Sequence, residues 1–266
     1  MLRKPLYLKS LRDHARGIAG WVGGIILIVV VQLSVYPTIR DSAEGWSELT
    51  KQFPKALQEI FRMSDYGSER GYLSTELLSF IVPFIFIGLG CTWGARVTTE
   101  DEESGAADVA LGLPISRHSY VATRMVAMFS VLLLAGVSFF CTLSVGARML
   151  NMSISLSDYA VASLTLTAVA IFFASLATCF GALWGKRTMA LGVAMATAIA
   201  LFILYSLAPL VDFLEPTTKV NPIQWTIGSQ PLTNGFDPAY MFWTVALSVL
   251  FGALTFVLYQ RRDISS

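Results

Sequence analysis

Long apolar runs separated by short polar segments dominate this chain. Six runs each provide the roughly 20 largely apolar residues that an α-helix needs to cross a bilayer. The fourth and fifth runs are separated only by residues 185–187 (Gly-Lys-Arg), which are enough for a tight turn at a membrane face. The pattern predicts an all-α membrane protein with transmembrane helices at Gly17–Pro37, Tyr72–Ala95, Met125–Ala147, Tyr159–Trp184, Met189–Val211 and Ala239–Tyr259.

Two polar stretches carry amphipathic patterns of their own. Residues 1–16 interleave leucines with lysines and arginines. They predict an elbow helix in the inner headgroup layer, with a plain basic flank as the alternative. Residues 38–71 form the longest loop, where apolar residues at three- and four-residue steps predict one or two short helices on the outer side. These apolar residues are Trp46, Leu49, Phe53, Leu57 and Ile60.

The basic residues orient the predicted helices. Cytoplasmic loops are enriched in Lys and Arg. Most of the 19 basic residues fall on one side of the predicted bundle, including Arg96, Arg124, Lys186–Arg187 and Arg261–Arg262. Both termini are therefore predicted to be cytoplasmic.

Composition and charge narrow the class of protein. The chain has 266 residues, of which 55% are hydrophobic and 14% charged, and its mean hydropathy is +0.62. These values are typical of a polytopic protein of the cytoplasmic membrane surrounded by lipid. The net charge of +1 gives no basic field for nucleic acid. Three cysteines inside apolar runs, without metal spacing, are expected to be buried and unpaired: Cys91, Cys141 and Cys179.

The predicted spans carry little chemistry. Glu76 and Arg148 lie near outer ends, and no ionisable residue falls at depth. Proton-coupled carriers and intramembrane proteases usually need such residues, so both classes are disfavoured. Pro83 is expected to kink or loosen the second span. Small-residue pairs are expected to let helices approach closely; they are Gly20/Gly24, Gly90/Gly94 and Gly181/Gly185.

The most charged stretch lies between the second and third predicted spans, at residues 98–117. We expect Thr98 or Thr99 to cap a short helix whose first turn contains Glu100–Glu103, because carboxylates stabilise the positive end of a helix dipole. Gly112 and Pro114 are expected to end this helix. The alternative, a metal site made by the four carboxylates, is disfavoured by this capping role. The face formed by Ala106, Ala107, Ala110 and Leu111 is apolar and calls for a partner or the bilayer surface.

The acidic cluster with E-x-G, followed by a helical run that ends in L-P-x-S-R, resembles the type-2 ATP-binding-cassette (ABC) exporter permeases. The basic N-terminal stretch, the long first outer loop and the Gly-Lys-Arg turn agree with this resemblance, which covers essentially the whole chain. Ala107–Asp108 departs from the threonine-glutamate-type pair of many relatives. The residues that match the motif are Glu103, Gly105, Leu113, Pro114, Ser116 and Arg117.

The resemblance implies that residues 98–117 are a coupling segment, which seats in a groove of a cytoplasmic ABC ATPase dimer. The chain would be a transport subunit and not an enzyme. Because the sequence has no Walker A pattern, the ATPase would have to be another chain. ATP and Mg²⁺ would bind the ATPase, and no cofactor or metal is expected in this chain. Six spans imply a second permease subunit, identical or paralogous. The substrate would be a hydrophobic or amphiphilic antibiotic, peptide or lipid. The alternatives are a non-transporting membrane partner that transmits a conformational signal from an ATPase, and an ATP-independent carrier.

Overall fold

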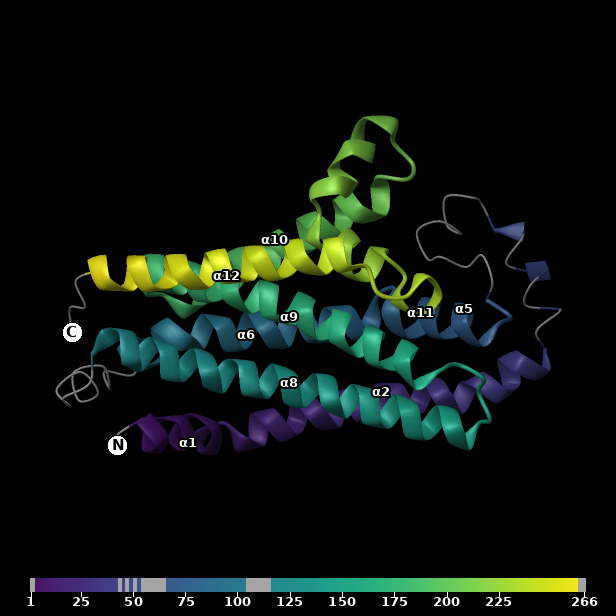
Figure 1. The fold of residues 1–266 in the computed structure, drawn as a ribbon, viewed down its shortest axis with the longest axis horizontal. Coiled ribbons are helices and arrows are strands. Elements are labelled where there is room, and N and C mark those ends of the chain that lie inside the picture. Colours follow the sequence, from purple (N-terminus) through teal and green to yellow (C-terminus); the bar gives the residue numbers. More distant parts are fainter. Residues whose placement is uncertain are drawn as a thin grey trace.

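The computed structural model describes residues 3–42, 45, 48–49, 52–53, 66–103 and 116–262, and all regular secondary structure within these ranges is helical. The long helices run side by side along one axis, and α1 begins at the end of the bundle where α12 finishes (Figure 1). Within these ranges, six segments are long and apolar enough to cross a membrane. This confirms the predicted all-α membrane fold, whereas the cytoplasmic location of the termini stays a prediction.

The spanning segments occupy the predicted runs with different ends. The first continues through Pro37 to Asp41, and the fifth ends at Leu207, before the predicted Val211. The second is interrupted and consists of α5 (Glu69–Leu73), the π-helical turn η1 (Ser74–Leu78) and α6 (Ile81–Glu103). The others are α2 (Ala15–Asp41), α8 (Arg117–Met149), α9 (Leu156–Trp184), α10 (Arg187–Leu207) and α12 (Pro238–Arg261).

Four shorter elements complete the described chain. Helix α1 (Arg3–Asp13) precedes α2 and contacts α8, where the Tyr7 hydroxyl donates to Ser130 Oγ at 3.0 Å. Its expected place in the headgroup layer stays a prediction. Between α10 and α12 lie a 3₁₀ helix, a π-helical turn and a short α-helix, namely η2 (Asp212–Val220), η3 (Gln224–Gly228) and α11 (Pro231–Asn234). Of the stripe expected in the long loop, Trp46, Leu57 and Ile60 lie outside the described residues.

Helices α6 and α9 form the centre of the bundle, and small residues set their separation. A Cβ atom at Gly90 or Gly94 would fall well inside van der Waals contact with a backbone carbonyl of α9. At this crossing Thr178 Oγ1 lies 3.1 Å from the Gly94 carbonyl oxygen. The Gly90/Gly94 pair therefore brings two backbones together, as small residues do in membrane helices. Added Cβ atoms at Gly20 and Gly24 would meet no atom of the described residues within 4 Å, so that pair brings no described helices together.

The interruption between α5 and α6 has a local cause. Pro83 has no backbone N–H, so it cannot donate to the carbonyl four residues earlier. The helix widens into η1 just before this point, and Pro83 falls in the first turn of α6, where a missing N–H costs little. The Ser79 hydroxyl donates to the Ser74 carbonyl oxygen at 2.9 Å across the widened turn. The second span is therefore interrupted on the N-terminal side of Pro83.

We predict that Gly94→Ala destabilises the protein, because the new methyl group collides with the Ala174 carbonyl and forces α6 away from α9. Overpacking of this kind costs about 1–3 kcal/mol, which corresponds to a fall in melting temperature of several degrees. The measurement is thermal unfolding of the purified protein in detergent. Gly192→Ala in α10 is the control, since its Cβ would meet nothing within 4 Å. Equal melting temperatures for the two variants would contradict close α6–α9 packing.

Candidate functional site

The acidic residues Glu100–Glu103 lie in the last turn of α6, not in the first turn of a new helix. The expected capping by Thr98 or Thr99 is therefore wrong. The Thr99 hydroxyl donates to the Ala95 carbonyl within α6 at 2.7 Å, and Thr98 donates to the Thr178 carbonyl on α9 at 3.3 Å. Carboxylates at the negative end of a helix dipole are unfavourable unless cations compensate them. The structure supplies these cations from other helices.

The first two carboxylates of this acidic turn, defined as Glu100–Glu103, are held by groups from α8 and from the α1–α2 junction. His14 Nε2 lies 2.7 Å from Glu100 Oε1. A guanidinium nitrogen of Arg124 lies 3.3 Å from Glu100 and 3.1 Å from Asp101. The Tyr120 hydroxyl also donates to Asp101. Arg124 is only 8% exposed, so its charge is little screened by solvent and depends on these two carboxylates.

The other two carboxylates connect the turn to α12 and α10. Glu102 forms an ion pair with Arg262, which directly follows α12. Arg262 also accepts a hydrogen bond at its carbonyl from Arg117 of α8, at 3.0 Å. Glu103 accepts a hydrogen bond of 2.7 Å from the backbone N–H of Arg187, the first residue of α10. Because Lys186 provides no side-chain cap for α10, the Glu103 carboxylate serves as its cap.

The acidic turn therefore joins parts of the chain that are distant in sequence. Within the described residues, it binds the α1–α2 junction, α8, α10 and α12 at one end of the bundle. Its carboxylates are engaged with cations and N–H donors. No group of three or more His, Cys, Asp or Glu in the described part of the chain is placed to hold a metal ion. The ion pairs and hydrogen bonds of the acidic turn connect the helices to one another, which is a structural role and not a catalytic one.

Three of the six residues predicted for coupling lie beside residues 104–115, which the structure does not describe, and three lie within them. Gly105, Leu113 and Pro114 lie outside the described residues. Glu103 precedes the segment and caps α10. After the segment, Ser116 is the N-cap of α8, where its hydroxyl accepts from the Ser119 N–H at 3.2 Å, and Arg117 begins that helix.

Sequence reasoning missed His14, Arg124 and Arg262 as members of the site. Arg124 was counted among the basic residues of an inner loop, but it lies within α8 and is buried. A signal for its burial was present, because Arg124 is followed immediately by the apolar run of the third span. Nothing in the sequence paired it with Glu100 and Asp101.

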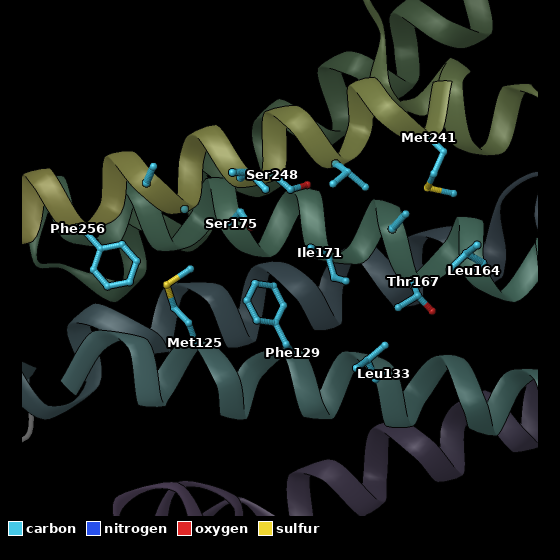
Figure 2. A pocket seen from close by; sticks show the side chains of 15 residues that line it. Met125, Phe129, Leu133, Leu164, Thr167, Ile171, Ser175, Met241, Ser248 and Phe256 are labelled. Carbon is cyan, nitrogen blue, oxygen red and sulfur yellow. The ribbon is translucent and has the colours of Figure 1, made fainter. Parts of the chain in front are cut away.

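A second candidate site is an apolar groove between α8, α9 and α12, with a volume of about 560 Å³ (Figure 2). Met125, Phe129 and Leu133 of α8 form one wall, and α12 forms the opposite wall. A further groove of about 520 Å³ lies along the contact between α2 and α8 and is lined in part by Cys141. Cys141 is exposed, so the expectation that all three cysteines are buried is wrong for this one.

We predict that Arg124→Gln destabilises the protein strongly, because it leaves Glu100 and Asp101 without their buried cation. Removing one partner of a buried ion pair costs about 3–5 kcal/mol, and the part-exposed carboxylates place this case at the lower end. The measurement is thermal or denaturant unfolding in detergent. Arg40→Gln is the matched control, since the Arg40–Asp41 pair is 51% and 69% exposed and such pairs contribute at most about 1 kcal/mol.

Partial recovery is expected when Arg124→Gln is combined with Glu100→Gln and Asp101→Asn, because the uncompensated charges are then removed. A triple variant no more stable than Arg124→Gln alone would show that the arginine acts through packing and not through its charge.

Comparison with known proteins gives the family. A family model described as "ABC-2 family transporter protein" matches residues 5–264, nearly the whole chain. A comparison with curated proteins finds no match. Together with the six spanning segments, the family match shows a multi-pass membrane transport protein. The chain belongs to the ABC-2 transporter family and is a permease of the ABC transporter class.

Proposed function

We propose that the chain is the permease subunit of an ATP-driven exporter, which moves a hydrophobic or amphiphilic substrate across the cytoplasmic membrane. A separate cytoplasmic ABC ATPase dimer would bind ATP and Mg²⁺ and hydrolyse the nucleotide. A second permease subunit, identical or paralogous, would complete the transporter. The family match supports the association with an ABC ATPase, as does the absence of a Walker A pattern from the printed sequence.

The observation that carries the proposal is the acidic turn at the end of α6. Residues 104–115 connect this turn to Ser116, so a force applied to them acts directly on Glu103 and on the start of α8. Glu103 is bonded to α10, and Arg117 is bonded to the residue that follows α12. A push from a cytoplasmic partner would thus reach several spanning helices at once. This is the property that a coupling segment requires.

The character of the spans supports an apolar or amphiphilic substrate. The sequence has no charged residue between Tyr159 and Trp184, between Met189 and Val211, or between Ala239 and Tyr259. Charged substrates usually need charged or water-lined paths through a membrane protein. The groove between α8, α9 and α12 is lined by uncharged residues. A hydrophobic molecule could therefore contact these helices without losing hydration energy.

We predict that Leu113→Asp reduces stimulation of the partner ATPase by at least about tenfold, because a carboxylate at this apolar motif residue would lose more than about 1.4 kcal/mol on desolvation against the partner. The measurement is ATPase activity of the complex in proteoliposomes, with transport followed in parallel. Phe213→Asp is the control. It adds the same charge at an 87% exposed position in η2, which follows the far end of α10.

Unchanged stimulation in Leu113→Asp would overturn the coupling assignment. Purification of the native protein without any ATPase would count against the whole proposal. Stimulated ATPase activity without movement of any substrate would favour the alternative of a membrane partner that transmits a conformational signal.

A further inference from the structure

His14 is the one residue between α1 and α2, and its ring contacts both α1 and the acidic turn. Nδ1 lies 2.9 Å from the Ser10 carbonyl oxygen in the last turn of α1, and Nε2 lies 2.7 Å from Glu100 Oε1 at the end of α6. The side chain is 18% exposed, and its ring makes a T-shaped contact with Trp93, with ring centroids 5.4 Å apart. The His14 ring therefore joins the end of α1 to the end of α6.

The two polar contacts of the ring specify its protonation state. A carbonyl oxygen and a carboxylate oxygen are both acceptors, so each ring nitrogen needs a hydrogen in order to bond with its partner. A neutral imidazole has one N–H, and its other nitrogen is an acceptor. In the neutral form, a nitrogen lone pair would therefore face an oxygen at one of the two contacts. The geometry around His14 is that of the doubly protonated imidazolium.

Loss of the proton would affect the two contacts unequally. A hydrogen bond to a carboxylate is stronger than one to a neutral carbonyl. The neutral ring would therefore keep its N–H on Glu100 and present a lone pair to the Ser10 carbonyl, which lies only 2.9 Å away. That contact would open. Since Ser10 lies in the last turn of α1, the change would move α1 relative to α2 and α6.

Charged groups of both signs belong to the elements around the ring. The carboxylates and the negative C-terminal ends of α1 and α6 attract the imidazolium, whereas the nearby arginines oppose it. The arginines stay charged at every accessible pH, and histidine is the side chain that ordinarily gains or loses a proton between about pH 5 and 8. The charged groups are Glu100, Asp101 and Arg96 on α6, Arg124 on α8, Lys9, Arg12 and Asp13 on α1, and Arg16 on α2.

We propose that His14 is a proton-dependent contact, in which the imidazolium fixes α1 against the acidic turn and loss of the proton releases the last turn of α1. The acidic turn directly precedes residues 104–115, so release of α1 loosens the end of the bundle on which the coupling segment acts. This effect on coupling rests on the proposed function, whereas the movement of α1 does not. Coupling is expected to be stronger at acidic pH than at alkaline pH.

The test measures the position of α1 against pH by double electron–electron resonance, in the purified full-length chain in lipid nanodiscs. Spin labels are placed at Leu8→Cys on α1 and Met149→Cys at the end of α8, which are 61% and 78% exposed. The background carries Cys141→Ser, because Cys91 and Cys179 are buried. The labels should give one narrow distance at about pH 5.5 and a second, displaced population at about pH 8.5.

The displaced population should rise at least about tenfold over this range, because a hydrogen bond from a charged donor is lost. An unchanged distance distribution between about pH 5 and about pH 9 would overturn the proposal.

Two matched variants assign the response, because His14 and His118 are the two histidines of the chain. His14→Gln removes the titratable ring and should show the displaced population at both pH values, with a response to pH below about twofold. His118→Gln is the control. His118 is exposed at the start of α8, where it contacts Gln260, so its replacement should leave the response as in the native protein. A native response in His14→Gln, or a lost response in His118→Gln, would overturn the role of His14.

A second measurement does not depend on the folding of His14→Gln. In His118→Gln, His14 is the sole histidine, so NMR of the ring nitrogens reports its protonation directly. Both nitrogens should carry hydrogens wherever the narrow distance is observed, and displacement of α1 should coincide with loss of one of them. A neutral ring together with the narrow distance would overturn the proposal.

These measurements use neither ATPase nor nucleotide, so their outcome is independent of the Leu113→Asp test. In the full complex, the native protein should stimulate the ATPase at least about twofold more than His14→Gln at about pH 5.5, and equally at about pH 8.5. Taking the ratio of the two proteins removes the pH dependence of the ATPase itself. A ratio that does not change with pH would overturn the effect on coupling.

Discussion

The bundle depends on the compensation of four consecutive carboxylates at the end of α6. The C-terminal end of a helix carries a partial negative charge, so Glu100–Glu103 occupy an unfavourable place unless cations and N–H donors surround them. His14, Arg124, Arg262 and the N-terminus of α10 provide this compensation. Each belongs to a different part of the chain. Four carboxylates that are unfavourable at the end of an isolated helix therefore fix the positions of the helices that supply their partners.

The rest of the bundle is held by close packing and not by charge. At the α6–α9 crossing, Gly90 and Gly94 allow backbone contact, and hydroxyls of Thr98 and Thr178 bond to carbonyls across it. In a bilayer, apolar surface is not driven out of water, so such packing and hydrogen bonding supply most of the attraction between helices. The two kinds of contact meet at α6, whose middle packs on α9 and whose last turn binds the other helices. Helix α6 therefore connects the close-packed centre of the bundle to the ion pairs at its end.

The hydropathy of the sequence was sufficient to predict the six spans, because a run of about 20 apolar residues has few other stable environments. It was insufficient for the end of α6, because two threonines followed by four acids are also the signature of a helix N-terminus. The residues that bond to these carboxylates are far away in sequence: His14 is separated from Glu100 by 86 residues, and Arg262 from Glu102 by 160 residues. The groove between α8, α9 and α12 was equally hidden, since its lining comes from three helices whose packing the sequence does not show.

The acidic turn and the groove share structural elements, and this connects the two candidate sites. Helix α8 carries Arg124, bonded to the acidic turn, and also Met125 and Phe129, which line the groove. Helix α12 leads to Arg262 at one end and forms the opposite wall of the groove along its length. Helix α9 is clamped to α6 through Gly94. Because α8 and the residue after α12 are bonded to the acidic turn, a change in these bonds would move the walls of the groove relative to the packed pair of α6 and α9.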